Sequence, residues 1–69
     1  MQSAISPATK IKSMLIALRN KRNISQTEFA KIMGMRQPNL AKFESRDDAK
    51  FSTIIKYAKA LGLKSIKLD

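Results

Sequence analysis

A chain of 69 residues makes one small domain, and its hydrophobic content of 43% suffices for a compact core. Fourteen lysines and arginines oppose five acidic residues, which gives a formal charge of +9. A small domain this basic attracts polyanions, so nucleic acid and anionic membranes are candidate partners, and a merely solvated basic surface is the alternative. The sequence has no cysteine and no histidine. Because the usual zinc ligands and catalytic bases are therefore missing, we expect no enzyme, no metal and no cofactor.

Neither a membrane span nor a secretory signal is evident in the sequence. No apolar run approaches the roughly 20 residues of a membrane-spanning helix, and the N-terminus lacks the apolar core of a signal peptide. We therefore expect a cytoplasmic protein. Its predicted organisation is a flexible N-terminal arm over residues 1–6, a helical domain over residues 7–62 and a C-terminal segment over residues 63–69.

The first predicted helix begins at Ser6 and Pro7, with serine as N-cap and proline at the first helical position. It ends near Lys21 or Arg22, where positive side chains suit the negative end of the helix dipole. Its apolar stripe, read from helical spacing, comprises Ile11, Met14, Leu15 and Leu18. We expect Ile24 to be buried between this helix and the next.

The segment Ser25–Glu44 predicts two short helices separated by a tight turn. Ser25 and Glu28 form the pattern of a capping box, and Gly34 supplies the left-handed conformation that ends a helix. The residues expected to face inward are Phe29, Ile32 and Met33 in the first helix and Leu40 and Phe43 in the second, over Gln37–Glu44. Two helices joined by a short turn with glycine make a helix-turn-helix, whose second helix enters the DNA major groove.

A polar loop leads to a further helix, for which Ser52 is the expected N-cap and Gly62 the terminator. This helix runs to about Leu61. The residues predicted to face inward are Ile54, Ile55, Ala58 and Leu61, and those predicted to face outward are Lys56 and Lys59.

The last seven residues, LKSIKLD, alternate in the manner of a β-strand, with Ile66 and Leu68 on one face. Because the chain offers no second strand, this strand would have to pair with a partner. Pairing with its own copy across a two-fold axis would make an isologous homodimer. A frayed tail with chance periodicity is the alternative.

The segment LRNKRNISQTEFAKIMGMRQPNLAKFE resembles the lambda-repressor-like, XRE-type helix-turn-helix family, and the resemblance covers residues 11–62. The cap, the core and the glycine turn match in register. FSTIIKYAKALGL followed by an alternating strand is further similar to HigA-like antitoxins. The resemblance implies an all-α domain of four to five helices with a short C-terminal strand. It also implies a homodimer that binds an operator and, for true antitoxins, a RelE-like ribonuclease toxin as partner.

The resemblance also implies roles for particular residues. Gln26 matches a glutamine that contacts a DNA phosphate and braces the first glutamine of the recognition helix, here Gln37. Gln37 matches a base-reading position, and a glutamine amide can bond to N6 and N7 of adenine. Asn39 and Lys42 match exposed recognition positions. Asparagine is suited to adenine, and lysine to guanine or a phosphate. Solvated helix surface is the plain alternative for each of these side chains.

A second match is the pair Arg19 and Glu44, which implies an ion pair that orients the recognition helix. Two features depart from the family. Pro38 stands where a polar reader is usual, so we expect one base contact fewer. The second departure is the acidic pair Asp47 and Asp48, placed where the family often carries basic or small residues. The residues then expected to hold phosphates, besides Gln26, are Arg36, Arg46 and Lys50.

These features predict a DNA-binding transcriptional regulator, a repressor that occupies a palindromic operator as a homodimer. The alternative is an antitoxin that neutralises a ribonuclease toxin and represses its own operon. A basic membrane-surface peptide is disfavoured, because such a peptide needs a free apolar helix face. Here the apolar faces are needed for one another.

Overall fold

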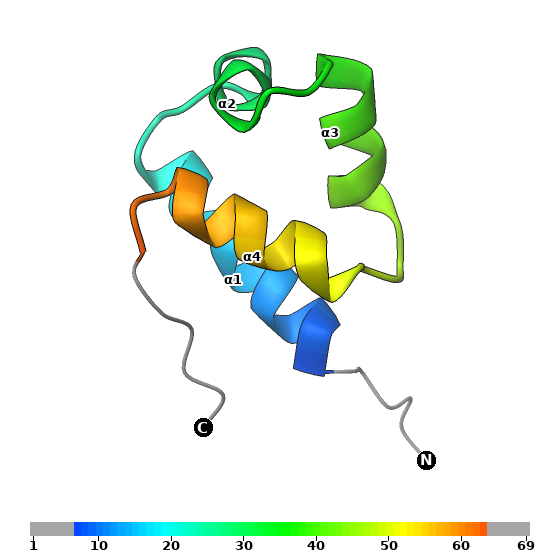
Figure 1. The fold of residues 1–69 in the computed structure, drawn as a ribbon. Coiled ribbons are helices and arrows are strands. Elements are labelled where there is room, and N and C mark those ends of the chain that lie inside the picture. The colour runs from blue at the N-terminus through cyan, green and yellow to red at the C-terminus, as the bar shows by residue number, and fades with distance from the viewer. Residues whose placement is uncertain (1–6, 64–69) are drawn as a thin grey trace.

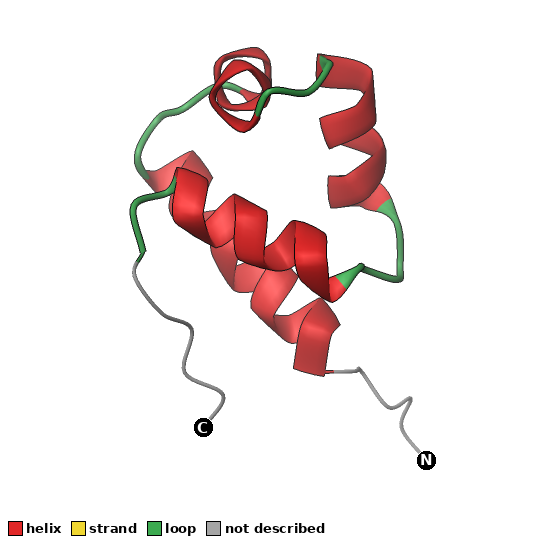
Figure 2. Cartoon of the chain, viewed as in Figure 1, coloured by secondary structure: helices red, strands yellow, loops and turns green. Residues whose placement is uncertain are grey.

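The computed structural model describes residues 7–63, which contain four helices and no strand. They are α1 (Pro7–Lys21), α2 (Gln26–Met33), α3 (Gln37–Ser45) and α4 (Phe51–Ala60), and loops join them as Figure 2 shows. In Figure 1, α1 and α4 run side by side, and α2 and α3 lie together beyond them. The predicted all-α fold is confirmed. The predicted strand with Ile66 and Leu68, and the arm over residues 1–6, lie outside the described residues.

Three of the predicted capping signals, Ser25, Gly34 and Gly62, mark helix ends in the structure. The Ser25 hydroxyl accepts a hydrogen bond from the main-chain N–H of Glu28 at 3.0 Å, so Ser25 is the N-cap of α2. Gly34 has a φ of 70° and Gly62 a φ of 86°, and each follows the helix that it was predicted to end. Asn23 takes the same left-handed conformation after α1, with a φ of 59°. At all three ends, paired main-chain bonds satisfy the last carbonyls of the helix, as in a Schellman motif.

The core lies between the four helices and is aromatic at its centre. The ring centroids of Phe29 and Tyr57 are 4.5 Å apart, and Phe43 lies 5.8 Å from Tyr57. The buried core residues are Leu15, Phe29, Ala30, Met33, Leu40, Ile54, Tyr57, Ala58 and Leu61. Ile24, predicted to be buried, packs against this cluster but is only half-buried. No helix within residues 7–63 is long and apolar enough to cross a membrane.

Three residues predicted to face the core do not. Met14 is 70% exposed, Ile32 is 56% exposed and Ile55 is 36% exposed. In α1 the inward face instead carries Lys12 and Arg19, which are only 3% and 6% exposed. In α2 and α4 the buried face carries Ala30 and Tyr57, each two positions from the exposed isoleucine and therefore on the opposite side of its helix.

The predicted start of α4 is also wrong. The helix begins at Phe51 with Lys50 as N-cap, and no side chain caps it. Ser52 therefore lies in the first turn of the helix and does not precede it. Because a good N-cap contributes only about 1 kcal/mol, the path of the preceding loop can override it.

Candidate nucleic-acid interface

Helix α3 presents a polar, partly basic outer face beside α2. Pro38, Lys42 and Ser45 lie at i, i+4 and i+7 and are all exposed, so they form the middle of this face. Gln37 lies at one edge of the face and exposed Asn39 at the other. Leu40 points the opposite way and is fully buried, which fixes how the helix is rotated on the domain.

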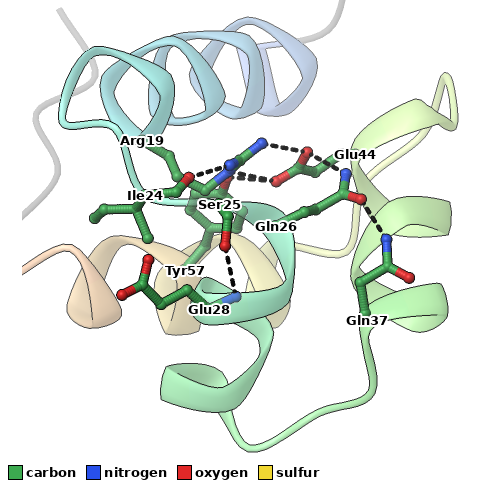
Figure 3. A network of polar contacts seen from close by, with 8 residues as sticks. All are labelled: Arg19, Ile24, Ser25, Gln26, Glu28, Gln37, Glu44 and Tyr57. Atoms are coloured by element: carbon green, nitrogen blue, oxygen red, sulfur yellow. Dashed lines mark hydrogen bonds and ion pairs between the residues drawn. The ribbon is translucent and has the colours of Figure 1, made fainter.

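The Glu44 carboxylate is the centre of a hydrogen-bond network that joins all four helices (Figure 3). Arg19 of α1 donates to both of its oxygens, from Nε at 3.0 Å and from Nη2 at 3.0 Å. Tyr57 of α4 donates to Oε2 at 2.6 Å, and Gln26 of α2 donates to Oε1 at 2.9 Å. Each carboxylate oxygen therefore accepts two hydrogen bonds, the full capacity expected of it. The network orients α3 against the body of the domain.

Burial and hydrogen bonding act in opposite directions on the charges of this network. Desolvation by burial raises the pKa of Glu44. The hydrogen bonds from Tyr57, Gln26 and Arg19 and the charge of Arg19 lower this pKa by more than burial raises it, so the net pKa is lowered. For Arg19, burial lowers the pKa while Glu44 and Tyr57 raise it, and the net pKa is raised. Burial and the bond to Glu44 raise the pKa of Tyr57. Arg19 and Glu44 thus stay charged and Tyr57 stays neutral at pH 7.

The network extends from Glu44 to the outer edge of α3. Because a carboxylate only accepts, Gln26 must turn its amide N–H₂ toward Glu44 and its carbonyl oxygen away. Gln37 then donates from Nε2 to Gln26 Oε1 at 2.6 Å (Figure 3). This leaves Gln37 with its carbonyl oxygen and one amide hydrogen for another partner. One acceptor and one donor side by side suit N6 and N7 of adenine.

The other predicted contact residues lie along α3 and the loop after it. A hollow of about 290 Å³ between α3, this loop and the start of α4 is lined by Met35, Asn39, Lys42, Phe43, Arg46, Asp48, Ala49, Lys50 and Thr53. It brings together four of the predicted residues, Asn39, Lys42, Arg46 and Lys50. Arg36 is exposed at the N-cap of α3 and does not line the hollow.

The acidic pair in the loop does not cancel this basic surface. Arg46 Nε lies 3.4 Å from an Asp48 carboxylate oxygen, and both side chains are largely exposed. An exposed pair of this kind contributes little, about 0–1 kcal/mol, and can open readily. Arg46 can therefore exchange Asp48 for a phosphate at small cost.

Sequence reasoning missed two side chains that shape this surface. Tyr57 places its hydroxyl on Glu44, and a buried tyrosine on an inward helix position should have signalled a polar partner. Lys12 donates from Nζ to the main-chain carbonyls of Phe43 at 3.0 Å, Asp48 at 3.2 Å, and Arg46. The sequence did indicate the burial of Lys12, because Lys12, Leu15 and Arg19 lie at i, i+3 and i+7 on one face of the helix.

Comparison with known proteins agrees with this geometry. The helix-turn-helix family matches residues 15–68. The chain is also similar to proteins named Antitoxin HigA1 from two strains of Mycobacterium tuberculosis, each 47% identical over 55 residues, which are 78% of this chain. The chain spans only about 37% of the length of these relatives. No solved structure matches it significantly. The chain belongs to the lambda-repressor-like helix-turn-helix family, and HigA antitoxins are among its relatives.

Proposed function

We propose that the protein is a transcriptional regulator that binds a specific DNA operator through α3 and represses by occupying it. The observation that carries this proposal is the hydrogen-bonded chain from Glu44 through Gln26 to Gln37, which fixes the amide of Gln37 at the edge of an exposed helix. A base-contacting side chain whose orientation is fixed before binding loses less conformational entropy when it binds DNA.

In this proposal the roles are divided between base edges and phosphates. Gln37, Asn39 and Lys42 read bases, and the residues that hold phosphates and set the register are Gln26, Arg36, Arg46 and Lys50. The formal charge of +9 supports such a surface. Pro38 lies in the middle of the outer face of α3. Its ring can offer only apolar contact, for example to a thymine methyl group, so the helix makes fewer base-edge hydrogen bonds than four polar readers would.

We further propose that the regulator acts as a homodimer in the cytoplasm. The predicted strand over residues 63–69, with Ile66 and Leu68, would pair with its copy and place two α3 helices on successive major grooves. Half-sites should then lie about 34–36 Å apart, one helical turn of DNA. Neutralising several phosphates should make binding fall steeply with added salt.

Selection of bound sequences from random duplex DNA tests this function. We expect enrichment of a palindrome, and sedimentation of the complex should give two chains per duplex. The matched variants Gln37→Ala and Lys42→Ala should weaken binding and relax the preference at one position each, by about 1–3 kcal/mol for a lost bidentate contact. Absence of any enriched sequence, or an unchanged preference in both variants, would contradict the assignment.

A second candidate function is that of an antitoxin. The similarity to Antitoxin HigA1 over 78% of this chain favours it. An antitoxin of this type would capture a RelE-like ribonuclease toxin and also bind its own operator. The test is co-expression with the product of the reading frame that adjoins its gene. A stable complex in which ribonuclease activity is suppressed would support the antitoxin function. Separate elution of the two proteins from a size-exclusion column would exclude this toxin as the partner.

A further inference from the structure

Lys12 is a buried ammonium group whose three donors all go to main-chain carbonyls. It is only 3% exposed, although it lies on α1 and its acceptors lie 31 to 36 residues further along the chain. The acceptors are the carbonyl oxygens of Phe43, Arg46 and Asp48. An ammonium has three hydrogens to donate, so Lys12 is fully used. Its Nζ also lies 5.4 Å from the centre of the Phe43 ring.

This arrangement replaces the usual helix terminator at α3. The other three helices are followed by a left-handed residue, Asn23, Gly34 or Gly62. Helix α3 instead leaves through Arg46 in an extended conformation, with φ of −78° and ψ of 154°. The carbonyls at the end of a helix need partners, and the helix dipole is negative there. Lys12 supplies both hydrogen bonds and a positive charge at that end.

Helix α1 holds the loop after α3 at three successive carbonyls. Lys12 binds the carbonyls of Arg46 and Asp48, and the hydroxyl of Thr9 donates to the carbonyl of Asp47 at 3.1 Å. Thr9 and Lys12 are three residues apart, so they share one face of α1. The main chain of residues 46–48 is therefore fixed relative to α1, while the Arg46 side chain extends to the surface beside the hollow.

We propose that Lys12 is a positioning residue for DNA binding, which acts through Arg46. By holding the end of α3 and the loop after it, Lys12 sets where the Arg46 guanidinium meets the phosphate backbone. This inference rests on the DNA-binding function proposed above. Lys12 thus holds the phosphate-binding loop, whereas Glu44 reaches the base-reading Gln37, at the opposite end of the same helix, through Gln26.

A double-mutant cycle on the selected operator duplex tests the proposal. Lys12→Met keeps an unbranched side chain one atom shorter but removes the ammonium, and Arg46→Ala removes the phosphate contact. We expect each single variant to weaken binding about three- to tenfold and to lower the salt slope by about one. If Lys12 acts through Arg46, the double variant should bind no more weakly than Arg46→Ala alone.

Two control variants distinguish an effect of the position of Lys12 on DNA binding from a general effect of losing one positive charge or of losing the fold. Lys10→Met removes the same charge from an exposed site on the same helix and should change binding less than twofold. Lys12→Arg keeps a buried cation with several donors and should restore a substantial part of the affinity and of the salt slope. All variants are compared at a temperature at which circular dichroism shows them folded, and Thr9→Val replaces Lys12→Met if the latter is unfolded.

The outcomes distinguish the inference from the function on which it rests. If the wild-type protein selects no DNA sequence, both fail. If the wild-type protein binds but Lys12→Met binds equally well, or if its effect multiplies with that of Arg46→Ala, Lys12 is only a structural residue and the proposal is overturned. Amide hydrogen exchange of residues 46–50 without DNA gives the independent readout, and we expect Lys12→Met to raise it selectively.

Discussion

Replacing Tyr57 by phenylalanine removes one hydroxyl from the centre of the domain and leaves the aromatic packing in place. That hydroxyl donates to Glu44 at 2.6 Å and accepts from Arg19 at 3.0 Å. A hydrogen bond to a charged group contributes about 1.5–3 kcal/mol. A 69-residue domain has a stability of roughly 3–10 kcal/mol, so Tyr57→Phe should remove a large part of it.

The assay is thermal and urea unfolding followed by circular dichroism. A loss of about 2 kcal/mol should lower the melting temperature by roughly 8–16 °C in a domain of this size. The urea m-value should stay constant, because the surface exposed on unfolding hardly changes. We expect α3 to remain helical in the folded variant, since buried Leu40 still anchors it.

A double-mutant cycle with Glu44→Gln shows whether the loss comes through the carboxylate. Removing one partner of a buried ion pair costs about 3–5 kcal/mol, so the Glu44 variant needs a stabilising osmolyte to stay folded. Residues in contact typically show coupling energies of about 0.5–3 kcal/mol. We therefore expect a coupling energy of about 1 kcal/mol or more between the two substitutions, which would show that the network acts as one unit. A Tyr57→Phe variant that melts with the wild type, within about 0.5 kcal/mol, would refute this reasoning.

Three further predictions concern stability. The folded-state pKa of Glu44 is lowered from its ordinary value of 4.5, so its contribution to the free energy of unfolding is present above pH 4.5 and should be lost as the pH falls below 4.5. The pKa of Tyr57 is raised from its ordinary value of 10.0, so its contribution is present below pH 10.0 and should be lost as the pH rises above 10.0. Urea unfolding measured across this pH range checks both. Asn23→Gly should be neutral or slightly stabilising, whereas Asn23→Val should cost about 1–2 kcal/mol because its φ is positive, and a valine variant of unchanged melting temperature would count against that strain. Leu40→Ala should cost about 2–5 kcal/mol, while Ile32→Gln should stay within about 0.5 kcal/mol, and equal losses would contradict the observed burial.

Local signals sufficed to predict where the helices lie and how α2 and α4 end. Ser25, Gly34 and Gly62 act through hydrogen bonds and main-chain angles within a few residues of themselves, so the sequence around them carries the whole cause. The start of α4 was missed because it depends on a loop that Thr9 and Lys12 hold from a distant helix.

The faces of the helices were harder to predict than their bounds. Apolar periodicity favoured Met14 and Ile55, but long polar side chains can be buried when they find partners. Lys12 finds its partners 31 to 36 residues away, and Arg19 finds Glu44 and Tyr57 25 and 38 residues away, which no local pattern reveals. The pairing of Arg19 with Glu44 was foreseen only through the family resemblance, since spacing alone relates them to no common face.

We propose that α3 reads DNA through Gln37, whose amide is held in place by Gln26 and Glu44. The most direct test is to measure affinities for the selected operator with each of the four base pairs in turn at the position facing Gln37, for the wild type and for Gln37→Ala. We predict that the wild type prefers adenine by about 1–3 kcal/mol and that the variant loses this preference at that position alone. An equal preference in both proteins, or a preference lost at every position together, would contradict the account.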